Sequence, residues 1–186
     1  GLAFFYRDDY AQCIENLNTF LHQRTENRTQ EEELEAKFHL GVAYFNIGKY
    51  GNAIPYLKDV VDYNDQNILA NYWYIFSIMA TDDLPKAQSL LEDCKQKFPN
   101  EGLFDKTFGD LFNLKADATK ARDYYMTAIE KSTEVIDTLT FYRELAKALT
   151  NINDTLGLIK CWETATSLLP ESSIAHRELL NIYELL

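Results

Sequence analysis

Few side chains in this sequence have the types and spacing that catalysis or metal binding requires. His22, His39 and His176 could each ligate a metal, but they are far apart and lack the i, i+4 partners of a metal-binding helix. We therefore interpret all three as isolated surface histidines. The sequence predicts no metal site and no cofactor.

Paired carboxylates are the next candidates for chemistry. Asp8–Asp9 and Asp82–Asp83 could form acid dyads, yet both fall at turns between helical stretches, where aspartate accepts hydrogen bonds from the first free N–H groups of a helix. Capping is the favoured interpretation. The sequence contains no glycine-rich phosphate loop, Gly-x-Ser-x-Gly elbow or EF-hand loop, so it predicts no enzyme activity.

The three cysteines give no stronger signal. Cys13, Cys94 and Cys161 are odd in number and lack the paired spacing of zinc or redox sites. We expect them to be small residues of the core.

Composition and charge narrow the function classes further. The chain has 186 residues, 46% of them hydrophobic, which is enough to bury a continuous core. Its net charge of -11 repels nucleic acid and anionic lipid surfaces. The longest uncharged apolar stretch, Ile68 to Ala80, is too short to span a membrane, which takes roughly 20 residues. No leader opens the sequence, which looks trimmed, so it does not indicate a compartment, and cytoplasmic is only the default.

A fixed spacing runs through the chain. A small or apolar residue is followed twelve positions later by another, and the second members lie 40, 34, 34 and 37 residues apart. The pairs are Gly1 and Cys13, Gly41 and Ala53, Ile75 and Ala87, Gly109 and Ala121, and Ala146 and Leu158. Large apolar residues follow three positions after each first member and four after each second, the latter being Leu17, Leu57, Leu91, Tyr125 and Trp162. A generic helical bundle has no reason to repeat at 34 residues.

This pattern resembles the tetratricopeptide repeat (TPR), a helix-turn-helix unit of 34 residues. The best copies contain Leu40-Gly41 with Tyr44, Phe108-Gly109 with Phe112, and Tyr142 with Ala146. The third copy departs from the pattern, because Ile75 occupies the small position and Asn71 the aromatic one. The resemblance implies an all-α, right-handed superhelical solenoid of antiparallel helix pairs, with about 11 helices.

We expect one solenoid over residues 1–186, as part of a longer protein. Its units are a partial repeat at 1–33, repeats at about 34–67, 68–101, 102–138 and 139–172, and a half-repeat at 173–186. Thr29 and Glu32 fit a capping box that starts the next helix early, whereas the three extra residues before Leu139 are expected to lengthen a turn. Turns are expected at Gly48-Lys49, Asp82-Asp83, Ala116-Asp117 and Asn153-Asp154.

The first helices of such pairs line a concave face, where a partner peptide or protein binds. In the early units the inward positions are aromatic or apolar, and in the later units they are polar and locally basic. The candidate groove residues are Phe5, Tyr6, Phe38, Val42, Phe45, Tyr72, Trp73, Phe76, Lys106, Asn113, Arg143, Lys147, Arg177 and Asn181. This distribution suits a partner with apolar anchors and an acidic end.

Three alternatives stay open. The aromatic residues can fill the interfaces between units, while the basic residues pair with Asp110, Glu144 or Glu178. Exposed apolar residues of the last helix, from Ser173 to Leu186, can instead mediate self-association through the solenoid ends. The chain can also be an accessory domain of a multidomain enzyme. Phe38, Val42 and Tyr72 stand where the family's two-carboxylate clamp needs polar residues, so that specificity is not assigned.

Overall fold

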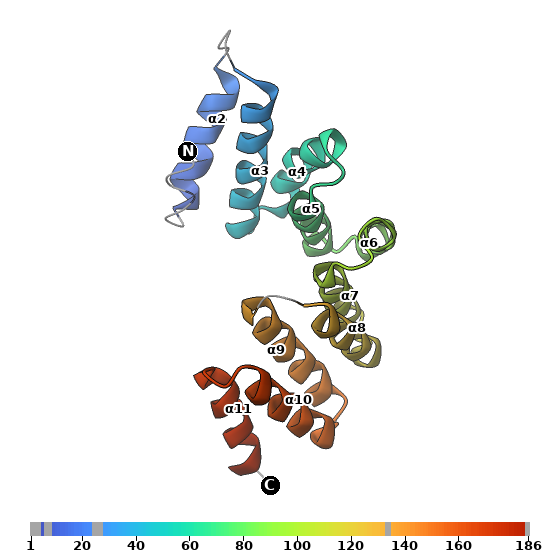
Figure 1. The fold of residues 1–186 in the computed structure, drawn as a ribbon. Coiled ribbons are helices and arrows are strands. Elements are labelled where there is room, and N and C mark those ends of the chain that lie inside the picture. Colours follow the sequence, from blue (N-terminus) through green and yellow to red (C-terminus); the bar gives the residue numbers. More distant parts are fainter. Residues whose placement is uncertain (1–4, 6–8, 24–27, 133–134, 185–186) are drawn as a thin grey trace. The chain divides into compact units, whose positions relative to one another are not determined.

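The computed structural model describes residues 5, 9–23, 28–132 and 135–184, and all regular structure in these ranges is helical (Figure 1). Ten helices follow one another in the described part of the chain, close to the number expected. They are α2 (Tyr10–His22), α3 (Gln30–Asn46), α4 (Tyr50–Tyr63), α5 (Ile68–Ala80), α6 (Leu84–Lys97), α7 (Gly102–Leu114), α8 (Ala118–Lys131), α9 (Val135–Asn151), α10 (Thr155–Leu168) and α11 (Ser173–Glu184). Tyr6 lies outside the described residues.

The chain divides into two compact units, Gly1–Leu90 and Leu91–Leu186. In the first unit α2 packs on α3, α3 on α4 and α4 on α5. In the second unit α7 packs on α8, and each later helix packs on the one before it through α11. Each unit is thus a stack of helices in chain order, as the repeat pattern predicts.

The four expected turns share one backbone conformation. Gly48, Asp82, Ala116 and Asn153 all have positive φ, which lets a helix end and the chain reverse within a few residues. An aspartate follows three of them, and the side chains of Asp83, Asp117 and Asp154 accept hydrogen bonds from backbone N–H groups of the next helix. The turn predictions are therefore confirmed. Of the two predicted aspartate pairs, Asp83 and Asp9 act as caps, the latter by accepting from the Gln12 N–H, while Asp8 lies outside the described residues.

Helix starts were predicted with mixed success. The capping box is present at α3, because Thr29 accepts from the Glu32 N–H and Glu32 accepts from the Thr29 N–H. Helix α4 continues through Pro55. The extra residues before Leu139 do not lengthen a turn. They extend α9, which has 17 residues and begins at Val135, because the inserted sequence contains neither glycine nor proline to stop a helix.

Close approach within a helix pair depends on glycine. A Cβ atom on Gly41 would lie 2.6 Å from Cγ of Leu57, and one on Gly109 would lie 2.4 Å from Cε1 of Tyr125. Leu57 and Tyr125 are both fully buried. The small positions therefore let α3 approach α4, and α7 approach α8.

The cysteine prediction is confirmed, whereas one histidine prediction is wrong. All three cysteines are buried and free of disulfides. His39 is only 9% exposed, not a surface residue, and its ring lies edge-on to the rings of Phe5 and Phe38. Its position on the packed side of α3, beside Leu40, explains the burial.

Candidate functional site

The predicted site residues of the first unit gather on α3 and α5. Phe45 of α3 lies 5.2 Å, between ring centroids, from both Trp73 and Phe76 of α5. Tyr72 lies 5.1 Å from Trp73 and stacks on Phe76. We call Phe45, Tyr72, Trp73 and Phe76 the aromatic cluster. Each ring remains partly exposed, so the cluster both joins two helices and offers apolar surface.

The other predicted residues of this unit are Phe5, Phe38 and Val42. Phe5 and Phe38 contact His39 from two sides. Val42 is 4% exposed, so its side chain belongs to the core. Phe5 and Phe38 therefore fill space between packed side chains, and the rings of the aromatic cluster do so in part, as the alternative interpretation of the aromatic residues predicts.

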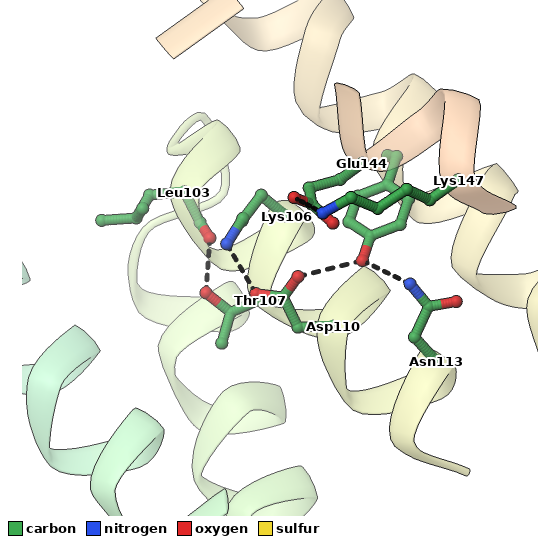
Figure 2. A network of polar contacts seen from close by, with 8 residues as sticks. Leu103, Lys106, Thr107, Asp110, Asn113, Glu144 and Lys147 are labelled. Atoms are coloured by element: carbon green, nitrogen blue, oxygen red, sulfur yellow. Dashed lines mark hydrogen bonds and ion pairs between the residues drawn. The ribbon is translucent and has the colours of Figure 1, made fainter. Parts of the chain in front are cut away.

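In the second unit Lys106 and Asn113 enter a hydrogen-bond network centred on Tyr125. The Tyr125 hydroxyl donates to Asp110 at 2.9 Å and accepts from the Asn113 amide at 2.9 Å. Lys106 donates to the other oxygen of Asp110 at 2.7 Å. Figure 2 shows Lys106, Asp110 and Asn113 of α7 in this network, together with the paired Glu144 and Lys147 of α9.

Electrostatics at this network follow from burial. Removal from water raises the pKa of the Asp110 carboxyl, and the nearby Glu144 adds to the rise, while Lys106 and Tyr125 oppose it. Burial, followed by the Asp110 charge, raises the pKa of the Tyr125 hydroxyl. The tyrosine therefore stays a neutral donor at ordinary pH.

A groove lies between α9 and α11, with α10 beneath it. Its volume is about 520 Å³, within the roughly 300–1,000 Å³ typical of binding sites. Leu158, Trp162 and Ile182 give it an apolar lining, and Arg143, Lys147 and Asn181 supply polar groups. We call it the α9–α11 groove. It brings together three of the predicted site residues.

Charges around this groove are partly neutralised. Lys147 pairs with Glu144 at 2.7 Å, and Glu178 also lines the groove. Arg177 lies 4.0 Å from Glu178 but does not line the groove. The exposed Arg143 forms no ion pair with any residue that the structure describes. The predicted pairing of Lys106, Lys147 and Arg177 with neighbouring acids is thus confirmed, and Arg143 is the basic group that is left over.

Sequence reasoning missed one buried charge. Asp105 of α7 is 1% exposed and binds Lys95 of α6 and Lys131 of α8, each at 2.6 Å. Lys95 also lies 4.8 Å above the ring of Tyr124. An aspartate among the apolar residues of α7 was the available signal. This trio joins three helices around a buried carboxylate, so we interpret it as structural.

In the described ranges no three His, Cys, Asp or Glu side chains come together in a way that could hold a metal ion. None of the helices described has the length and apolar composition needed to cross a membrane.

Comparison with known proteins identifies the fold. The tetratricopeptide repeat model matches residues 34–67, whereas no curated protein matches the chain in sequence. A thermophilic TPR protein of Thermus thermophilus has a similar structure, with a TM-score of 0.73 at 15% identity, covering 100% of this chain and 96% of that one.

Two further structures are similar over most of this chain. A tetratricopeptide repeat protein of Parabacteroides merdae gives a TM-score of 0.67 at 13% identity, covering 98% of this chain and 69% of that one. Yeast Tom70 gives 0.69 at 18% identity, covering 93% of this chain but 39% of its own. The predicted resemblance is confirmed: residues 34–67 form a tetratricopeptide repeat, and the chain has the fold of the tetratricopeptide-repeat proteins, which are generally scaffolds for protein interaction.

Proposed function

We propose that this chain is a non-catalytic scaffold that binds an acidic segment of a partner protein in the α9–α11 groove. The observation that carries the proposal is the convergence of Arg143, Lys147 and Asn181 around an apolar floor. A carboxylate of the partner would pair with Arg143 and compete with Glu144 for Lys147, while an apolar side chain would pack on Trp162.

The aromatic cluster is proposed to take apolar anchors of a partner. Its rings already contact one another, so a partner side chain would add to an ordered surface without much reorganisation. Tyr72 and Trp73 present ring area together with a polar atom, a combination that is enriched in protein interfaces.

The test is capture of partners from native cell extract on the immobilised chain, with a charge-reversed groove. Arg143→Glu with Lys147→Glu should abolish capture of the partner that the wild-type chain retains. Lys58→Glu with Lys120→Glu is the matched control, because it changes the net charge equally at exposed positions of α4 and α8. Equal loss in both double variants, or retention in the groove variant, would overturn the assignment of the groove.

Self-association is the second candidate. Leu180 and Tyr183 of α11 are 56% and 48% exposed, which gives the last described helix an apolar outer surface. If this surface joins two copies, mass in solution should rise with concentration and Leu180→Glu should keep the chain monomeric. A mass that stays constant with concentration would exclude self-association and leave partner binding in the α9–α11 groove as the remaining proposal.

A further inference from the structure

A second groove in the unit Leu91–Leu186 lies on the second helices of the helix pairs, α8 and α10. It runs between α8 and α10, has a volume of about 540 Å³, and is distinct from the α9–α11 groove in all its lining residues. Tyr142, Leu145 and Leu149 of α9 line it and are buried, so they form its floor. We call it the α8–α10 groove.

The groove exposes apolar surface. Met126 lines it with 48% of its surface exposed, and the partly buried Ile129 lies one turn further along α8. Methionine is flexible and polarizable, so it adapts to the side chains of a bound partner.

Both walls include charges of either sign, with Arg122, Asp123 and Glu130 on the α8 side and Asp154 and Lys160 on the α10 side. Glu130 stands on the α8 wall and Lys160 on the α10 wall, and both are exposed. Neither takes part in an ion pair among the residues that the structure describes, whereas Asp123 on the α8 wall is held by Arg122 at 2.7 Å. Asp154 accepts a hydrogen bond from the Gly157 N–H at the start of α10, so Glu130 and Lys160 are the lining charges without an ion pair or a cap, one on each side of the apolar floor.

We propose that the α8–α10 groove binds an amphipathic helix of a partner protein, with basic residues along one flank and acidic residues along the other. Apolar residues at i, i+3, i+4 and i+7 of such a helix form a ridge that fits between two helices. Its basic flank faces Glu130 and its acidic flank faces Lys160. The chain would then hold two partner segments on separate faces of one unit.

This inference does not depend on the proposed function of the α9–α11 groove. A chain with Arg143→Glu and Lys147→Glu should bind the helix as the wild type does. Failure of one groove would leave the other unaffected.

The probe is a set of three synthetic helical peptides of about four turns with the same apolar ridge. One peptide carries lysines on one flank and glutamates on the other, the second carries lysines on both flanks, and the third glutamates on both. The lysine–glutamate peptide should bind about fivefold more tightly than either of the others at physiological salt.

The readout is NMR of a chain labelled at the methionine methyl groups. The chain has two methionines, Met126 in the groove and Met79, which is buried in the first unit and serves as the internal reference. Adding the lysine–glutamate peptide should shift the Met126 signal and leave the Met79 signal in place.

Single charge reversals at exposed positions then test the orientation of charge. Lys160→Glu should transfer the preference to the all-lysine peptide, and Glu130→Lys should transfer it to the all-glutamate peptide. Three results would overturn the proposal: a Met126 signal that no peptide moves, equal shifts with all three peptides in the wild type, or a shift caused by protein concentration alone, which would assign the groove to a second copy.

Discussion

The residue that packs over the glycine differs between the two units. In the first unit Leu57 lies over Gly41, and in the second Tyr125 lies over Gly109, at the same position of the repeat. Leucine fills the space with carbon alone. Tyrosine brings a buried hydroxyl, which has to find hydrogen-bond partners.

The partners of that hydroxyl change the neighbouring helix surface. Phe38, Val42 and Phe45 of α3 correspond in the repeat to Lys106, Asp110 and Asn113 of α7. Asp110 and Asn113 bond to Tyr125, and Asp110 binds Lys106. The polar residues of α7 thus accompany the tyrosine over Gly109, whereas α3, with leucine over Gly41, carries apolar residues at the same three positions.

Charge is also inverted at one position of the repeat. Lys37 of α3 binds Glu33 and Asp59, whereas Asp105, its counterpart in α7, binds Lys95 and Lys131. The first arrangement is half-exposed and the second is centred on a buried carboxylate. Burial should make the second far more sensitive to substitution.

The largest expected effect is therefore at Asp105. Asp105→Ala should lower the free energy of unfolding by about 3 kcal/mol, because Lys95 and Lys131 lose their common partner. Lys37→Ala should cost less than about 1 kcal/mol, as for other half-exposed pairs. Urea unfolding measures both, and equal costs would remove the distinction between the two sites.

Substitution of the two glycines should give the next largest effect. Gly109→Ala should cost about 1–3 kcal/mol, because the rigid ring of Tyr125 is held by its hydroxyl and cannot move aside. Gly41→Ala should cost less, since the Leu57 side chain can change rotamer. The same urea measurement decides the order, and a costlier Gly41→Ala would contradict the role of the ring.

Asp110 should make stability fall as pH rises. The pKa of Asp110 is raised in the folded state. Its contribution to the free energy of unfolding is therefore fully present below the ordinary pKa of 3.8 and is lost as pH rises through the folded-state pKa. Relative to Asp110→Asn, the wild type should lose stability across that range. Val42→Asn, at the corresponding position of the first unit, is the control and should show no such pH dependence relative to wild type.

His39 should give the smallest effect, with the opposite sign. Burial lowers the pKa of its imidazole from 6.5, so its contribution to stability is present above that value and is lost as pH falls through the folded value. Relative to His39→Leu, the wild type should become less stable in mildly acidic solution. A constant difference between the two proteins from pH 8 to pH 5 would show that folding leaves the pKa of His39 unchanged.

Most of the fold could be predicted because it depends on short-range spacing. The positions of glycines, turn aspartates and the Thr29 capping box lie within a few residues of the structures they produce. The burial of His39 could not be predicted, because it depends on Phe5, which is distant in sequence. The ion pairs of Asp105 depend on helices α6 and α8, which the repeat pattern places only approximately.

The site was predicted less completely than the fold. Lys147 and Asn181 occupy equivalent positions of α9 and α11, and Arg143 lies one turn before Lys147, which is why the repeat pattern could place these three residues in one groove. The bonds that hold Lys106 and Asn113 in the Tyr125 network were not predicted. They arise because a tyrosine stands over Gly109 where the first unit has a leucine over Gly41. An opposite-charge groove between α8 and α10 was not foreseen, because neither wall alone has an unusual sequence.

The most direct test of this account is a double-mutant cycle between Tyr125 and Asp110. Tyr125→Phe, Asp110→Ala and the double variant are compared with wild type by urea unfolding. Since the hydroxyl and the carboxylate bond to each other in a buried site, we predict a coupling energy of about 1–3 kcal/mol. Effects that simply add would contradict the claim that the interior tyrosine determines the polar surface of the second unit.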